Sequence, residues 1–221
     1  MCIRTPKLAA ALALVGALAG APVAMGGSTT YFNPGATYFG QSSSPFQEVL
    51  GKVNVFENFE NGTINSLIKA TGGAIQGPSA TTDSVDAGGS SYATTGKSMT
   101  FRFNGANGAK PTMAGLAWTD GKANSIITFK AWDASGKLIG KITATLGDLS
   151  RRGTTGEDRF FGISSDNGIS KIRISSNKAG FEVDHLLAYG FSVVPVPPAL
   201  GLGLAGLAGL GLWRRRSAKK G

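Results

Sequence analysis

The chain has 221 residues, of which 42% are hydrophobic and 16% charged, and a formal net charge of +9. Two basic residues near the start and five after Trp213 account for +7, so the stretch from Glu48 to Asp184, which holds all 13 acidic residues, is close to neutral. A basic chain ordinarily suggests nucleic acid as a partner, but because this excess lies at the two ends we exclude nucleic-acid binding.

Residues 1–26 are predicted to be a secretory signal peptide with a signal helix. Arg4 and Lys7 precede an uncharged run from Leu8 to Met25 that is rich in Ala and Leu, as in the n-region and h-region of such peptides. A retained N-terminal anchor is the alternative. The only cysteine, Cys2, precedes the run, so the mature chain would fold without disulfides even though export permits them.

Residues 27–45 are predicted to be a flexible or lightly docked segment, because Gly, Ser, Thr, Asn and Pro dominate them. Residues 46–192 have one mixed composition and no internal repeat. Their number suits a single domain able to bury a core.

Apolar and polar residues in this domain alternate with a period of two, which predicts half-buried antiparallel strands. The clearest runs are 127–131, 138–146, 172–174 and 181–184, and further strands are expected over 53–59, 64–70, 98–103 and 111–118. Clusters of Asp, Asn, Ser and Gly at 119–121, 133–136, 166–168 and 176–180 predict turns. The pattern indicates an all-β fold, a single antiparallel β-sandwich of jelly-roll type.

Residues 193–221 form a tail of three parts: a proline-rich start, an uncharged run of Ala, Gly and Leu ending at Trp213, and a basic end. As a helix, residues 199–213 would rise about 22 Å, which is short for a bilayer core of roughly 30 Å. We therefore expect a marginal C-terminal transmembrane helix. The positive-inside rule places the basic end in the cytoplasm. The cluster there contains Arg214, Arg215 and Arg216.

The order of these parts resembles the sorting signal of PEP-CTERM proteins, in particular the VPLPA-CTERM variant. The motif that carries the resemblance is Val194, Pro195, Val196, Pro197, Pro198 and Ala199. Val196 stands where the family usually has Leu. The resemblance implies transient anchoring in the inner membrane, processing by an exosortase, and delivery to the cell surface or the extracellular polysaccharide matrix. An ordinary membrane anchor is the alternative.

A second, looser resemblance covers the domain. Residues 56–60, 115–121, 160–163, 172–175 and 183–186 are similar to those of jelly-roll ectodomains often found ahead of such tails, which resemble carbohydrate-binding modules in architecture. Fold analogy assigns no ligand.

Three acidic residues are candidates for a structural calcium site: Glu57 and Glu60 near the first strand, and Asp184 near the last. The end strands of a jelly roll lie side by side, and carboxylates brought together there would repel one another unless a cation with oxygen ligands joined them. Many sandwiches of this shape hold a calcium in such a place. The alternative is that all three are solvated side chains on strand faces.

Trp118 and Trp132 could present their rings to a sugar, with Asp120 as a hydrogen-bonding partner. Tyr92, Asn107 and Asn124 are further candidates. Trp132 is favoured because alternation with Ile127 and Ala131 points it outward. A large ring on a strand is also commonly part of the core.

No catalytic motif is evident. His185, the only histidine, follows Asp184, but adjacent strand residues point to opposite faces, so the aspartate is not expected to orient the imidazole. The leading hypothesis is therefore an exported, non-enzymatic surface or matrix protein. A lectin-like carbohydrate-binding module is the alternative, and a polysaccharide hydrolase that uses two carboxylates is a second one.

Overall fold

The computed structural model describes residues 28–46, 53–79, 81–85, 89–149 and 155–193. The signal peptide, the sorting motif 194–199, the basic cluster 214–216 and both expected flanking helices lie outside these ranges. Within them, no helix has the length and apolar character needed to span a bilayer. The helical turns that the described residues form are short 3₁₀ elements, namely η1 (Gln41–Ser43), η3 (Ala106–Gly108) and η4 (Thr155–Glu157).

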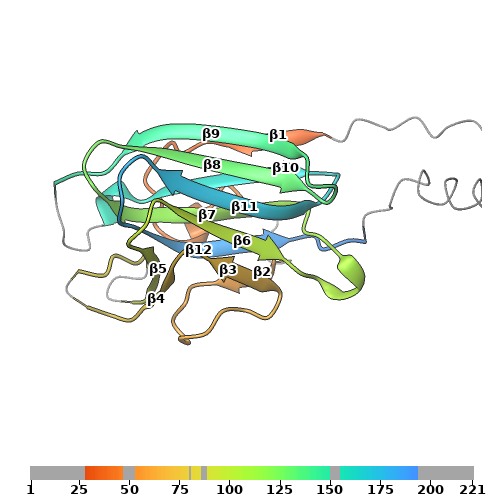
Figure 1. The fold of residues 1–221 in the computed structure, drawn as a ribbon, viewed down its shortest axis with the longest axis horizontal. Helices are drawn as coiled ribbons and strands as arrows, with labels where there is room; N and C mark the ends of the chain where they lie inside the picture. The colour runs from red at the N-terminus through yellow and green to blue at the C-terminus, as the bar shows by residue number, and fades with distance from the viewer. Residues whose placement is uncertain (1–27, 47–52, 80, 86–88, 150–154, 194–221) are drawn as a thin grey trace, which may run out of the picture.

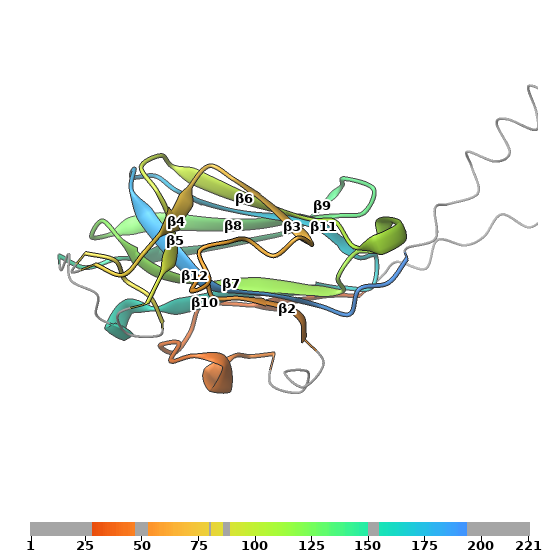
Figure 2. The same cartoon turned by 90° about the horizontal axis from the view of Figure 1, so that it is seen from below.

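The described chain is an antiparallel two-sheet sandwich, as the alternation predicted (Figure 1). Its strands are β1 (Thr29–Phe32), β2 (Val53–Glu57), β3 (Ile68–Thr71), β4 (Ala74–Gln76), β5 (Ser91–Thr94), β6 (Ser98–Phe103), β7 (Met113–Gly121), β8 (Ser125–Asp133), β9 (Leu138–Leu146), β10 (Arg159–Ser165), β11 (Ile169–Ser176) and β12 (Phe181–Tyr189). One sheet has the order β3-β6-β11-β8-β9. The other has seven strands in the order β1-β10-β7-β12-β5-β4, with β2 also paired to β12. Figure 2 shows the two layers edge-on.

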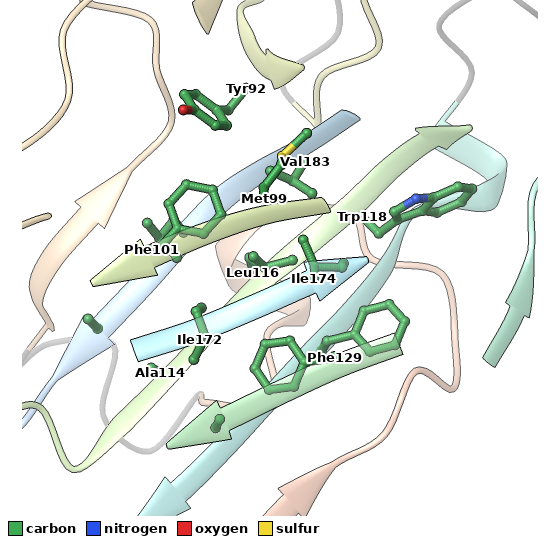
Figure 3. Close-up of a cluster of buried hydrophobic side chains, with 14 of the residues drawn as sticks. Tyr92, Met99, Phe101, Ala114, Leu116, Trp118, Phe129, Ile172, Ile174 and Val183 are labelled. Atoms are coloured by element: carbon green, nitrogen blue, oxygen red, sulfur yellow. The ribbon is translucent and has the colours of Figure 1, made fainter. Parts of the chain in front are cut away.

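The core lies between the two sheets and is built from alternate residues of their strands. Met99 and Phe101 of β6 and Phe129 of β8 face Leu116 and Val183 of the opposite sheet (Figure 3). All of these side chains are at most 1% exposed. Burial on this scale is the main source of stability, since a buried Leu or Phe side chain contributes about 1.5–3 kcal/mol.

Strand β12 is the centre of the seven-stranded sheet. It pairs with β7 along one edge, while its other edge pairs first with β5 and then with β2. All nine of its residues are buried, including Glu182, Asp184 and His185. A strand buried on both faces must satisfy its polar side chains inside the protein, because an unpaired buried polar group is costly.

Residues 27–45 were expected to be flexible or lightly docked, but the described part from residue 28 onward belongs to the sandwich, together with Phe46. Its β1 pairs with β10. Tyr38 and Phe46 then cover the outer face of the seven-stranded sheet, where they pack with Phe160 and Leu187 in a second hydrophobic cluster. In Figure 2 this orange segment lies beneath the β7, β10 and β12 layer. Its aromatic residues, spaced among glycine and serine, supply the apolar surface that docks it.

Two sequence predictions differ in detail from the structure. Residues 119–121 were expected to form a turn, but β7 continues through them and the turn comes at 122–124, where Asn124 has a positive φ of 55°. Asparagine tolerates that conformation better than most residues. The strand expected over 64–70 begins only at Ile68, and strands β1, β4, β5 and β10 were not predicted.

Candidate functional site

A pocket of about 850 Å³ opens at one end of the sandwich, the left end in Figure 1. Its walls come from the β3–β4 turn, the end of β5, the β7–β8 turn, the β11–β12 turn and the segment after β9. Turns between strands place side chains and backbone groups together without disturbing the core, and so binding sites commonly form there.

The polar lining of the pocket includes a group of carboxyls. Asp120, Asp148 and Glu182 line it directly, and Glu157 stands behind them. The Glu157 side chain hydrogen-bonds that of Asp120 and accepts the backbone N–H of Asp148 at 3.0 Å. Burial, followed by the charges of Asp148 and Asp120, raises the pKa of Glu157 to about 8. Glu157 is therefore mainly protonated at neutral pH, and burial raises the pKa of Asp120 as well.

Glu182 is a separate acidic group at the inner wall. Burial raises its pKa, an effect opposed by the hydrogen bonds that it accepts from the Ser91 hydroxyl at 2.7 Å and the Asp83 backbone N–H at 2.9 Å. These contacts hold the carboxyl in place.

Glycine and lysine complete the lining. Gly72, Gly73, Gly121 and Gly180 expose their backbone to the pocket, where a ligand can approach peptide groups closely. A Cβ on Gly121 would stand 2.7 Å from the Trp118 ring, so this wall has no room for a larger residue. Lys122 and Lys178 supply positive charge beside the carboxylates.

The three predicted sugar-binding residues lie in three different places. Trp118 is fully buried in the core, and so its predicted role as an exposed sugar platform is wrong (Figure 3). Trp132 does point outward as predicted, on the other sheet, where the Lys171 ammonium stands 4.1 Å from its ring centroid. Only Asp120 lines the pocket.

The additional candidates do not join the pocket lining either. Tyr92 is buried and its hydroxyl donates to the Gly73 carbonyl at 2.7 Å. Asn107 and Asn124 occupy turns with positive φ.

The predicted calcium residues each accept backbone hydrogen bonds of their own. Glu57 accepts from Phe59 and Asn65, Glu60 accepts from Ser90, and Asp184 accepts from Val85. Across the described ranges, no three His, Cys, Asp or Glu side chains are grouped so that they could hold a metal ion. Glu57, Glu60 and Asp184 therefore do not fit the predicted calcium site.

The Asp184–His185 pair departs from strict strand alternation. A bulge between β12 and β7 falls here, and His185 has a positive φ of 44°. The bulge brings His185 Nε2 to 4.0 Å from Asp184 Oδ2, so the expectation that the two residues point apart is wrong. Because His185 is 2% exposed and its Nδ1 lies 3.1 Å from the Tyr38 hydroxyl, the imidazole has no open path to a substrate.

Asp158 is the most unusual buried acid in the described chain. It is 0% exposed, and neither side-chain oxygen has a hydrogen-bond partner among the described residues. Burial, followed by the charges of Asp83, Glu157 and Asp184, raises its pKa to about 8. The carboxyl is therefore mainly protonated at neutral pH, beneath the segment that carries Tyr38.

Sequence reasoning missed most of the pocket. Gln76, Asp148, Lys178 and Glu182 come from four separate segments, and no local motif connects them. The predicted turns at 119–121 and 176–180 were the sequence signals that pointed toward this end of the molecule.

No family model and no curated protein matches the sequence. Among solved structures, the module CsCBM6-3 from Clostridium stercorarium in complex with cellobiose is 18% identical with a TM-score of 0.32, over 55% of this chain and 86% of that one. A xylan-binding domain from CBM 22 is 14% identical with a TM-score of 0.31, over 66% and 99%. The enzymatically active domain of tailspike protein 4 from bacteriophage CBA120 is 16% identical with a TM-score of 0.31, over 61% and 20%. At such values, nothing about the ligand of this chain follows from these similarities.

Proposed function

We propose that this chain is an exported, non-catalytic carbohydrate-binding protein of the cell surface or extracellular matrix, with a jelly-roll sandwich that binds a sugar in the end pocket. The observation that carries the proposal is the lining of that pocket. Side-chain carboxyls, an amide, hydroxyls, ammonium groups and glycine backbone converge on one opening. A polyhydroxylated ligand offers both donors and acceptors to such a set, and the volume suits a small ligand or part of a polymer.

The position of the chain ends supports the same role. Thr29 of β1 lies opposite Ser165, and Tyr189 of β12 lies opposite Met113, whose other neighbour is Ser164. The first and last described strands therefore both have their chain termini at the end of the sandwich that lies opposite the pocket. The tail, with its resemblance to a sorting signal processed by an exosortase, would anchor the protein there and leave the pocket facing outward.

The geometry of the acidic pair favours binding over hydrolysis. Glycosidases place their two carboxyl groups roughly 5–9.5 Å apart, so that a sugar or a water fits between them. Asp120 and Glu157 instead interact directly with each other, which differs from either glycosidase arrangement. We therefore expect no release of reducing ends from glucans, xylans, mannans or galactans.

The test is calorimetric titration of the full-length chain with neutral oligosaccharides from those four polymer classes. We expect saturable binding of at least one class. Gln76→Ala should weaken that binding by roughly 2- to 10-fold, the equivalent of one hydrogen bond. Gln76 is exposed at the pocket, so its loss should leave the fold intact.

Lys137→Ala is the matched control, because Lys137 is an exposed residue in the β8–β9 turn at the far end. It should bind like the wild type. Absence of binding to all four classes, or equal binding by Gln76→Ala and the wild type, would contradict the proposal.

A further inference from the structure

The outer face of the five-stranded sheet carries basic residues and no acidic ones. This basic face consists of Lys69 on β3, Arg102 on β6, Lys171 and Arg173 on β11, Lys130 on β8 and Lys141 on β9. Figure 1 looks onto this face. The one acidic residue on the five strands, Asp133, is 6% exposed and binds the backbone and hydroxyl of its own turn. The charges of the domain, nearly balanced in sum, are therefore separated in space.

The strand register aligns the six cations in two rows across the sheet. The rows are Lys69, Arg102 and Lys171, and Arg173, Lys130 and Lys141, each residue standing directly opposite the next. Neighbouring strands lie about 4.8 Å apart. The face thus presents a grid of positive charge at short, regular intervals.

This arrangement is unfavourable for the isolated protein. Like charges directly opposite each other destabilise a sheet, and each row contains two such pairs. Within the described residues, none of the six cations forms an ion pair with a carboxylate. Four of them are exposed and two, Lys130 and Lys171, are half-buried. A bound polyanion would relieve the repulsion that the fold leaves uncompensated.

The remaining side chains of the face indicate which polyanion fits. Around the cation rows stand hydroxyl groups, those of Thr71, Ser98, Thr100, Thr128, Thr143 and Ser175. Hydroxyls suit a partner that is itself rich in hydroxyl groups. The face has a single large aromatic ring, Trp132, whereas proteins that bind single-stranded nucleic acid stack successive bases on several rings.

A lipid surface fits the face less well. Peripheral membrane binding combines basic residues with apolar side chains that enter the headgroup region. On the basic face, the exposed aliphatic residues are Ile126 and Leu138, which lie near opposite ends of the β8–β9 pair. They form no continuous apolar stripe beside the cations.

We propose that the basic face binds an acidic polysaccharide, one whose repeating unit carries a carboxylate. The polymer lies across the strands, with its carboxylates against the cation rows and its hydroxyls against the Thr and Ser side chains. This surface is separate from the end pocket and does not depend on a sugar binding there.

The test measures binding of the full-length chain to polygalacturonate. The face variant is Lys130→Gln with Arg173→Gln, and the matched control is Lys97→Gln with Lys137→Gln, which removes the same charge from exposed turn residues. Both variants keep the basic tails, so the tails cannot account for a difference. We expect the face variant to bind about tenfold or more weakly, since hydrogen bonds to charged groups are the stronger ones. The control should stay within about twofold of the wild type.

Three further measurements complete the test. Polygalacturonate should raise the melting temperature of the wild type and of the control more than that of the face variant. Gln76→Ala should leave polygalacturonate binding unchanged, which separates this surface from the pocket. With neutral dextran, which lacks carboxylates, the melting-temperature shift should be the same for the face variant and the control. Equal weakening in both double variants, or tighter binding of duplex DNA, oligo(dT) or phosphatidylglycerol vesicles than of polygalacturonate, would overturn the proposal.

Should the face variant fail to fold, Lys141→Gln on the edge strand β9 replaces it, with Lys137→Gln as control.

Discussion

The two outer faces of the sandwich differ in what covers them. On the seven-stranded sheet, Tyr38 and Phe46 close an aromatic cluster over β10 and β12, with the buried acids Asp158 and Asp184 beneath. On the five-stranded sheet nothing in the described chain covers the cation rows. One face is an extension of the core, and the other is a surface under electrostatic strain. We therefore expect the first face to contribute more to stability, while the second is open to the partner proposed above.

The sharpest way to test this comparison is to remove one aromatic ring from each face. Phe46 is 2% exposed and packs edge-on against Phe32 and Phe160, with centroids 4.9 and 5.1 Å away. Phe46→Ala should lower the free energy of unfolding by about 3–5 kcal/mol. Trp132→Ala removes a half-buried ring with one cation–π contact and should cost about 1 kcal/mol. Urea unfolding measures both, and equal losses would show that the two faces contribute alike.

The next effect is a pH dependence that belongs to the covered face. The pKa of Asp158 is raised from its ordinary 3.8 to about 8, so the folded state holds this proton more tightly than the unfolded state does. The resulting stabilisation is complete below about pH 4 and is lost as the pH rises toward 8. We expect melting temperatures to fall across that range, and Asp158→Asn to reduce the slope.

Asp166→Asn is the control for this experiment, since Asp166 is exposed and binds only at the edge of the sandwich, through the Ser28 backbone N–H. The melting temperature of Asp166→Asn should fall with pH as steeply as that of the wild type. If the melting temperature of the wild type did not change with pH, or if Asp158→Asn left its pH dependence unchanged, the buried Asp158 carboxyl would not contribute to the pH dependence of stability.

The smallest effect, and of opposite sign, is expected on the basic face. Lys130 stands between Arg173 and Lys141, and Lys130→Glu converts two repulsive pairs into attractive ones. The substitution should raise the free energy of unfolding by about 0.2–1 kcal/mol, while Lys137→Glu in the turn should change it less. Added salt should reduce the difference. Destabilisation by Lys130→Glu would show that the cation rows are not under strain.

Sequence periodicity predicted the half-buried strands well and the central ones poorly. From Ile127 to Trp132 of β8, each inward apolar residue is followed by a polar one or by Trp132, and so the inward and outward sets could be predicted. In β7 the run from Ala114 to Trp118 contains no polar residue, because both faces of that strand are covered. Alternation therefore could not predict which face of the sheet Trp118 occupies. Its burial follows only from the position of β7 between β10 and β12.

The sites were harder to predict than the strands, for two different reasons. The pocket joins residues from Gly72 to Glu182, and only the sheet order shows that their turns meet. The basic face, in contrast, was visible in principle: Lys130, Lys171 and Arg173 fall on the polar positions of alternating strands. Summing the charge over the whole domain concealed this face, because the acidic residues that balance the sum lie outside it.

The threefold pairing of β12 has a consequence for the order of events during folding. Leu187 of β12 pairs with Phe56 of β2, and β12 also pairs with β5 and β7. The seven-stranded sheet therefore cannot be completed before residues 181–189 have been synthesised. Contacts between such distant parts of a chain form slowly. Until β12 has been made, the seven-stranded sheet stays incomplete, and an incompletely folded chain suits the passage through a translocation channel that the proposed export requires.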